Sequence, residues 1–107
     1  MIHKDLAQGR WFKLSLAEQL GNAGGEFERA LTAKKQGDDT RLEKATARFY
    51  ELMDLTIADP RWRGLRRREI SRAKEQSAEC LESEGAAGAP GLQQYFLQFA
   101  LLARAKI

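Results

Sequence analysis

The side chains of this sequence that are able to act as a nucleophile, a base or a metal ligand are few and widely separated. His3 is the only histidine, and Cys80 is the only cysteine. A nucleophile needs a base beside it, and a metal site needs a cluster of Cys, His and acidic residues. Asp38 and Asp39 are adjacent, but they follow a glycine at an expected helix boundary, where capping is the typical role. The sequence therefore predicts a protein that is not an enzyme and that has no cofactor or metal ion, with Cys80 buried and His3 solvated.

Three glycines, Gly21, Gly24 and Gly25, interrupt the first apolar pattern of the chain. A phosphate-binding glycine loop is excluded because no strand pattern precedes them and no Lys-Ser/Thr pair follows them. Two alternatives remain. The chain breaks into two short helices at Gly24–Gly25, or one helix continues and Ala17, Gly21 and Gly25 form a flat strip that another helix approaches. We favour the continuous helix because the apolar stripe keeps its helical phase across the glycines.

A basic stretch from Arg61 to Arg68 is the strongest chemical signal in the sequence. It combines cations with an aromatic ring that is able to stack on a base, a pattern typical of nucleic-acid binding. The net charge of +3 is small, and the glutamates that follow would repel a phosphate backbone. Nucleic-acid binding is therefore the alternative function. Its candidate residues are Arg61, Trp62, Arg63, Arg66, Arg67 and Arg68.

The helix expected at residues 65–83 carries its charges in the reverse of the stable order. Its first half is basic and its second half acidic, whereas the helix dipole favours acids at the start and bases at the end. Each misplaced charge costs about 0.3–1 kcal/mol. Three interpretations remain open: a solvated helix with Arg66 paired to an acid such as Asp54 or Asp59, a dimer of two such helices laid antiparallel, and contact with phosphates.

Apolar periodicity predicts four helices near residues 15–35, 40–58, 65–83 and 92–105. We therefore expect an all-α fold, an antiparallel up-down four-helix bundle. It is a single domain of residues 1–107, in which residues 1–10 are a loosely ordered lead-in and residues 85–91 are a linker of small residues before the last helix.

Several residues mark the expected helix ends. Ser15 and Glu18 have the spacing of a capping box. Gly37 is expected to end the first helix in the left-handed conformation, and Asp39, or Thr40 paired with Glu43, to cap the second. The segment 59–60, Asp-Pro, is expected to stop the second helix and to lead into a short turn at residues 60–64.

The last expected helix is apolar around most of its circumference. Such a helix must be covered on more than one side, so it lies at the centre of a bundle or in an oligomer interface. Leu55 falls on the polar face of the second helix and is a further candidate contact, although a lone exposed leucine is common. The candidate interface residues are Leu55, Arg66, Arg67, Lys74, Glu75, Glu79, Glu82, Leu97 and Leu101.

Composition indicates a cytoplasmic protein. A single cysteine excludes an internal disulfide and suits a reducing compartment. The N-terminus lacks the apolar run of a secretory signal, and no apolar stretch is long enough to span a bilayer. We therefore expect no membrane partner.

Three blocks of the sequence occur in an order that resembles a known family: Ser15–Asn22 (SLAEQLGN), Leu55–Arg61 (LTIADPR) and Arg68–Arg72 (REISR). The family consists of small uncharacterised prokaryotic helical proteins, and the resemblance covers residues 11–76. It implies a helical fold and no particular activity. The Gly/Ala-rich linker at residues 85–91 departs from the tyrosine-rich pattern of that family.

At the level of fold only, a short helical bundle is similar to HEPN-type ribonucleases and to small bundle proteins encoded in ribosomal RNA intervening sequences or beside reverse transcriptases. HEPN nucleases use an arginine followed closely by a histidine. No histidine follows Arg10 in this sequence, so that activity is excluded.

Taken together, the residues predict a non-enzymatic helical-bundle protein that acts as a self-associating interaction or adaptor module. A homo-oligomer, with the dimer favoured, is the expected assembly, and another protein is a further expected partner. A nucleic-acid-binding accessory protein is the alternative.

Overall fold

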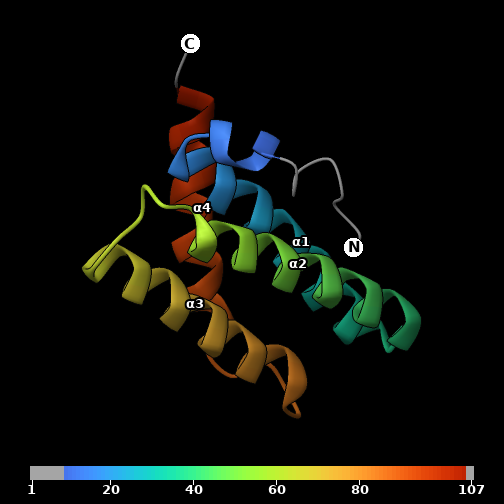
Figure 1. Ribbon diagram of the computed structural model, residues 1–107. Coiled ribbons are helices and arrows are strands. Elements are labelled where there is room, and N and C mark those ends of the chain that lie inside the picture. The colour runs from blue at the N-terminus through green and yellow to red at the C-terminus, as the bar shows by residue number, and fades with distance from the viewer. Residues whose placement is uncertain (1–8, 106–107) are drawn as a thin grey trace.

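Four α-helices form the chain between residues 9 and 105, which are the residues that this computed structural model describes (Figure 1). A short 3-10 helix, η2 (Trp11–Lys13), precedes them. The helices are α1 (Leu16–Gln36), α2 (Asp39–Ala58), α3 (Leu65–Glu82) and α4 (Ala89–Ala105). Residues 9–105 contain no strand, so the predicted all-α four-helix fold is confirmed.

α1 is the central helix of the fold, because both α2 and α4 pack against it. α1 and α2 lie side by side as an antiparallel pair, α3 lies beside α2, and α4 runs across α1 (Figure 1). α4 begins at Ala89, three residues before the expected start at residue 92. Part of the predicted linker at residues 85–91 is therefore helical. The physical reason is that Pro90 needs no helical hydrogen-bond partner in the first turn, where its fixed φ suits a helix.

The predicted start and the predicted end of α1 are both confirmed. The Ser15 hydroxyl accepts a hydrogen bond from the Glu18 backbone N–H at 3.1 Å, and the Glu18 carboxylate accepts one from the Ser15 N–H at 2.8 Å. Gly37 ends the helix with φ of 69°, a left-handed conformation that glycine adopts without a steric penalty.

The predicted cap of α2 is wrong by one residue. Asp38, not Asp39 or Thr40, accepts the hydrogen bond from the Arg41 backbone N–H at 3.1 Å. The reason is the tight turn at Gly37, where the Asp38 N–H is held by the Ala33 carbonyl at 2.9 Å. That turn places the Asp38 side chain over the first free N–H groups of the next helix.

Three phenylalanines from three helices form the centre of the core. The rings of Phe27 on α1, Phe49 on α2 and Phe96 on α4 are all fully or almost fully buried. Each pair of ring centroids is 5.6 Å apart. At this distance tilted and edge-to-face rings attract each other beyond the effect of burial alone. α3 adds Ile70 to the core, together with the buried Cys80 that the sequence predicted.

The predicted continuity of α1 through its glycines is confirmed, because the helix runs unbroken from residue 16 to residue 36. The strip that another helix approaches was predicted at Ala17, Gly21 and Gly25, and the structure agrees with this only in part. A Cβ placed on Gly24 would lie 2.5 Å from the Phe96 Cβ, and one on Gly21 would lie 3.0 Å from the Ala100 Cα. Gly25 has open space instead. The contact strip is therefore formed by Gly21 and Gly24, because these two residues and not Gly25 face α4.

Substituting the two adjacent glycines by alanine is expected to have opposite effects on stability. Gly24→Ala forces a methyl group against the Phe96 Cβ, which is not the end of a flexible side chain, and this overpacking costs about 1–3 kcal/mol. Gly25→Ala meets no atom and gains helix propensity, which raises stability by about 0.5–1 kcal/mol. Urea unfolding followed by far-UV circular dichroism, at one protein concentration, measures both changes. A Gly24→Ala protein as stable as the wild type contradicts the close approach.

Candidate functional site

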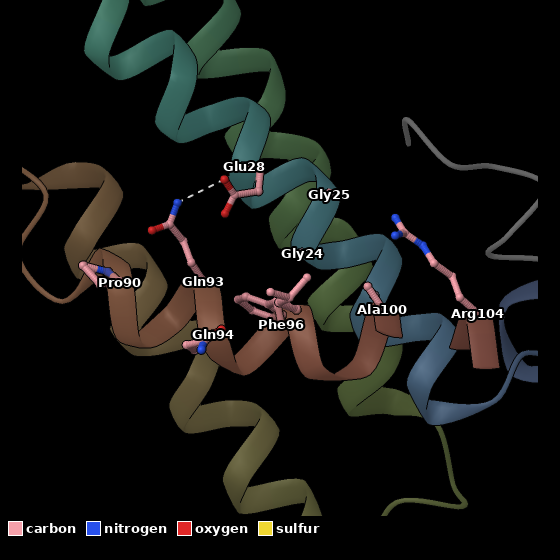
Figure 2. Close-up of a pocket in the computed structure, with 11 residues that line it drawn as sticks. Gly24, Gly25, Glu28, Pro90, Gln93, Gln94, Phe96, Ala100 and Arg104 are labelled. Carbon is pink, nitrogen blue, oxygen red and sulfur yellow. Dashed lines mark hydrogen bonds between the residues drawn. The ribbon is translucent and has the colours of Figure 1, made fainter. Parts of the chain in front are cut away.

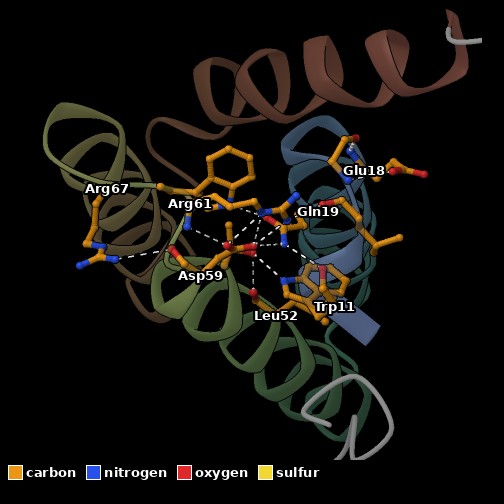
Figure 3. Close-up of polar contacts among 11 residues, drawn as sticks. Trp11, Glu18, Gln19, Leu52, Asp59, Arg61 and Arg67 are labelled. Atoms are coloured by element: carbon orange, nitrogen blue, oxygen red, sulfur yellow. Dashed lines mark hydrogen bonds and ion pairs between the residues drawn. The ribbon is translucent and has the colours of Figure 1, made fainter. Parts of the chain in front are cut away.

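A buried cluster of polar side chains lies where η2, α1 and the end of α2 meet (Figure 3). The Gln19 amide nitrogen donates to the Asp59 carboxylate and to the Trp11 carbonyl, both at 2.9 Å. The Gln19 carbonyl oxygen accepts from the Trp62 indole at 2.7 Å. The Trp11 indole donates to the Thr56 hydroxyl at 3.0 Å. We call these five residues, together with Arg61, the polar junction.

Asp59 is the centre of the polar junction. Its carboxylate is fully buried and accepts hydrogen bonds from the Arg61 backbone N–H at 3.0 Å and from the Arg61 guanidinium at 2.7 Å. The same guanidinium donates to the Leu14 carbonyl at 2.6 Å. Burial opposes ionisation of Asp59, but the hydrogen bonds from Arg61 and Gln19 outweigh it and hold the pKa of Asp59 below its usual value. The junction thus locks the turn after α2 onto the start of α1.

Three of the six predicted nucleic-acid residues make internal contacts in the polar junction or beside it. Arg61 and Trp62 hold Asp59 and Gln19, and the guanidinium of Arg61 lies 4.6 Å from the Trp62 ring centroid. The Arg63 guanidinium donates to the Pro60 carbonyl at 3.0 Å. The Trp62 ring is therefore part of the fold and is not presented as a free stacking surface.

The other predicted nucleic-acid residues lie at the exposed start of α3. Arg66 pairs with Glu69 on the same helix at 2.9 Å, so its predicted pairing with Asp54 or Asp59 is wrong. Glu69 is closer, because it lies one turn away on the same face of α3. Asp54 pairs instead with Lys74, and Asp59 pairs with Arg61. Arg67 contacts the Asp59 carbonyl at 3.5 Å. Arg68 is exposed and forms no ion pair with any residue between 9 and 105.

Residues of α1 and α2 offset part of the reversed charge pattern of α3. The Lys34 ammonium of α1 donates to the carbonyls of Cys80 and Ser83 at 2.6 and 2.5 Å. This places a cation at the C-terminal end of α3, where the helix dipole favours one. Lys74 pairs with Asp54 of α2 at 2.5 Å. The charge pattern of α3 therefore does not by itself require a second subunit.

Two further predicted interface residues also have neighbours inside the chain. Leu55 is half-buried and packs against the core. Glu82 lies near Tyr50, and burial together with this carboxylate raises the pKa of Tyr50 to about 12. Glu75 and Glu79 are exposed on α3.

α4 carries three of the four large hydrophobic side chains that are exposed within residues 9–105. Its inward side, formed by Ala89, Leu92, Phe96 and Phe99, is buried. Leu97, Leu101 and Leu102 are 46%, 52% and 55% exposed. Leu97 and Leu101 were predicted as interface residues, and within residues 9–105 no other element covers them. This helix was expected to be covered on more than one side, and within the described part of the chain no element packs over the side that carries Leu97 and Leu101.

A groove runs between α1 and α4 (Figure 2), and Leu97 is one of the residues that line it. Its floor is formed by the glycines of α1 and by Ala100 of α4. Glu28 lies at one end, where its carboxylate accepts a hydrogen bond from the Gln93 amide at 3.1 Å. Arg104 lies at the other end (Figure 2). Neither Glu28 nor Arg104 forms an ion pair with another residue that the structure describes.

Comparisons of the chain with protein-family models, with curated proteins and with solved structures find no match. The resemblance drawn from the three sequence blocks therefore stays a prediction. Within residues 9–105, no group of three or more Cys, His and acidic residues is placed to hold a metal ion. No helix of this part of the chain is long and apolar enough to cross a membrane. His3 lies outside the described residues.

The polar junction is the feature that the sequence patterns missed. Gln19 and Asp59 are fully buried, yet the sequence patterns gave Gln19 no role in the fold and expected Asp59 to end α2 or to pair with Arg66. The signal that could have found them is the phase of Gln19, which falls on the apolar face of α1 beside Leu20 and Ala23. A polar residue in that phase predicts a buried partner.

Replacing the buried carboxylate is expected to destabilise the fold. Asp59→Asn places an amide N–H₂ group against the donors of Arg61 and Gln19 and costs about 2 kcal/mol. Asp54→Asn, the matched control, removes an exposed ion pair and costs less than about 1 kcal/mol. Urea unfolding at pH 7 measures both. Equal losses would contradict the central role of the junction.

Acid is expected to remove the contribution of Asp59. Because the pKa of Asp59 is lowered by folding, its stabilisation is present above the unfolded-state pKa, about 3.9, and is lost as the pH falls through the lower folded-state value. The free energy of unfolding should therefore decrease as the pH falls below about 4. The slope should be smaller in Asp59→Asn than in the wild type. The same slope in both proteins would show that other carboxylates cause the acid sensitivity.

Proposed function

We propose that this protein is a non-enzymatic interaction module that associates with itself as a dimer. The observation that supports the proposal is the exposed apolar side of α4. Of the four large hydrophobic side chains exposed within residues 9–105, three belong to this one helix. Single exposed leucines are normal, but Leu97 and Leu101 lie one turn apart on the same face of this helix, and neighbouring exposed apolar side chains mark an interaction surface.

The state of Cys80 supports the non-enzymatic part of the proposal. Its side chain is buried in the core, and burial raises the pKa of the thiol despite the nearby Lys34. A thiol with a raised pKa is a poor nucleophile because little thiolate is present at neutral pH. The structure thus gives Cys80 a packing role. A cytoplasmic location is proposed on the same grounds as from the sequence, since a single buried thiol suits a reducing compartment.

Nucleic-acid binding remains the alternative function, with less support. Its favourable feature is the exposed start of α3, where Arg68 and Arg72 form no ion pair with any described residue. Its aromatic component is Trp62, and that ring is held by Gln19 and Arg61. Salt-sensitive binding to RNA or DNA that is lost in Arg68→Glu would establish this function.

Self-association is expected to depend on the leucines of α4. Sedimentation velocity from about 1 to 100 μM should show a monomer–dimer equilibrium in the wild type, an affinity range typical of weak complexes. Leu101→Gln should raise the dissociation constant about tenfold because it removes apolar area at the interface.

Leu65→Gln is the matched control, because Leu65 is 80% exposed on α3. It should leave the dissociation constant unchanged. A wild type that stays monomeric over the whole concentration range overturns the proposed function. A dimer weakened by Leu65→Gln and not by Leu101→Gln places the interface on α3.

A further inference from the structure

We propose that two copies of the chain pair through their α1–α4 grooves about a twofold axis that lies midway between Leu97 and Leu101. In this arrangement Arg104 of each copy binds Glu28 of the partner subunit. The inference rests on the proposed self-association and adds to it the surface, the orientation and the charged contacts.

The order of residues along the groove sets the geometry. α1 and α4 run in opposite directions, because Gly21 meets Ala100 and Gly24 meets Phe96. The hydrogen bond from Gln93 to Glu28 continues this order toward the start of α4 (Figure 2). Glu28, the acidic residue of the groove, is therefore held beside Gln93, near the N-terminal end of α4.

One exposed stripe of α4 borders the groove. Leu97, Leu101 and Arg104 follow one another at steps of four and three residues, so they lie on the same face of the helix. Leu97 and Arg104 both line the groove, and Leu101 continues the stripe between them. Leu102 projects from a different part of the circumference and is not included in the proposed contact.

A twofold axis through this stripe makes the surface complementary to itself. When a second α4 lies antiparallel with the axis midway between the two leucines, Leu97 meets Leu101 of the partner subunit. By the same count, Arg104 comes level with Gln94 of the partner subunit. That position is one residue, or about 1.5 Å along the axis, from the partner's Gln93 and the Glu28 that it holds. Such an interface is isologous, with each contact made twice.

Charge complementarity identifies a second copy as the occupant. The groove has an acid at one end and a base at the other, and neither is neutralised by a residue that the structure describes. An antiparallel copy pairs both charges at once, whereas a parallel copy places like charges together. Gly25 leaves open space beside the stripe, where an added Cβ would meet no atom. The partner's leucines therefore have room to approach the backbone of α1.

The test is an exchange of charges between the two positions. Glu28→Arg and Arg104→Glu each create two like-charge contacts in a homodimer and should raise the dissociation constant about tenfold. An equimolar mixture of the two single variants should recover the wild-type dissociation constant, because each contact in the mixed dimer again joins an acid and a base. The double variant should recover it as well. Arg68→Glu, an exposed cation of α3 without an ion pair, is the matched control and should have no effect.

The outcomes separate this inference from the function on which it rests. A monomeric wild type overturns both. A dimer whose dissociation constant is unchanged by Glu28→Arg and Arg104→Glu overturns the inference alone. Recovery in the double variant without recovery in the mixture shows a contact within one chain, and this also overturns the inference. Circular dichroism of each single variant checks that it folds, and the mixture supports the pairing only if both are folded.

Discussion

The close approach of α1 and α4 at Gly24 is the constraint on which the rest of the structure depends. Because no side chain separates the two helices there, Phe96 reaches Phe27 and Phe49, and the three rings close the core. The same contact turns one side of α4 inward and leaves the other side, with Leu97 and Leu101, uncovered. A single glycine thus connects the packing of the core with the surface proposed for self-association.

The polar junction holds together a second part of the molecule, where η2, the start of α1 and the turn after α2 meet. One buried carboxylate, Asp59, joins the turn after α2 to η2 and the start of α1 through Gln19 and Arg61. Lys34 then closes the far end of α3 by binding its last carbonyls. Lys34 and Asp54, both distant from α3 in the sequence, therefore offset part of its reversed charge pattern. The support for self-association therefore comes from the exposed leucines of α4 and not from the charge pattern of α3.

Periodicity and capping chemistry were sufficient to predict the helices, because both are local. The capping box at Ser15, the left-handed Gly37 and the unbroken α1 are confirmed. The partners of Gln19 and Lys34, and the choice of Gly24 over Gly25 as the contact, were beyond prediction because they depend on how helices far apart in sequence are rotated against each other. Of the candidate site, Leu97 and Leu101 were predicted from the breadth of the apolar surface. Glu28, Gln93 and the groove they share with Arg104 became visible only in three dimensions.

The most direct test of the central claim is an isotope-filtered nuclear Overhauser experiment on a dimer formed from labelled and unlabelled chains. The account predicts contacts between the methyl groups of Leu97 in one chain and Leu101 in the other, and none that involve Leu65. Contacts between chains that join the α3 helices, or no contact at either leucine of α4 in a dimeric sample, would contradict it.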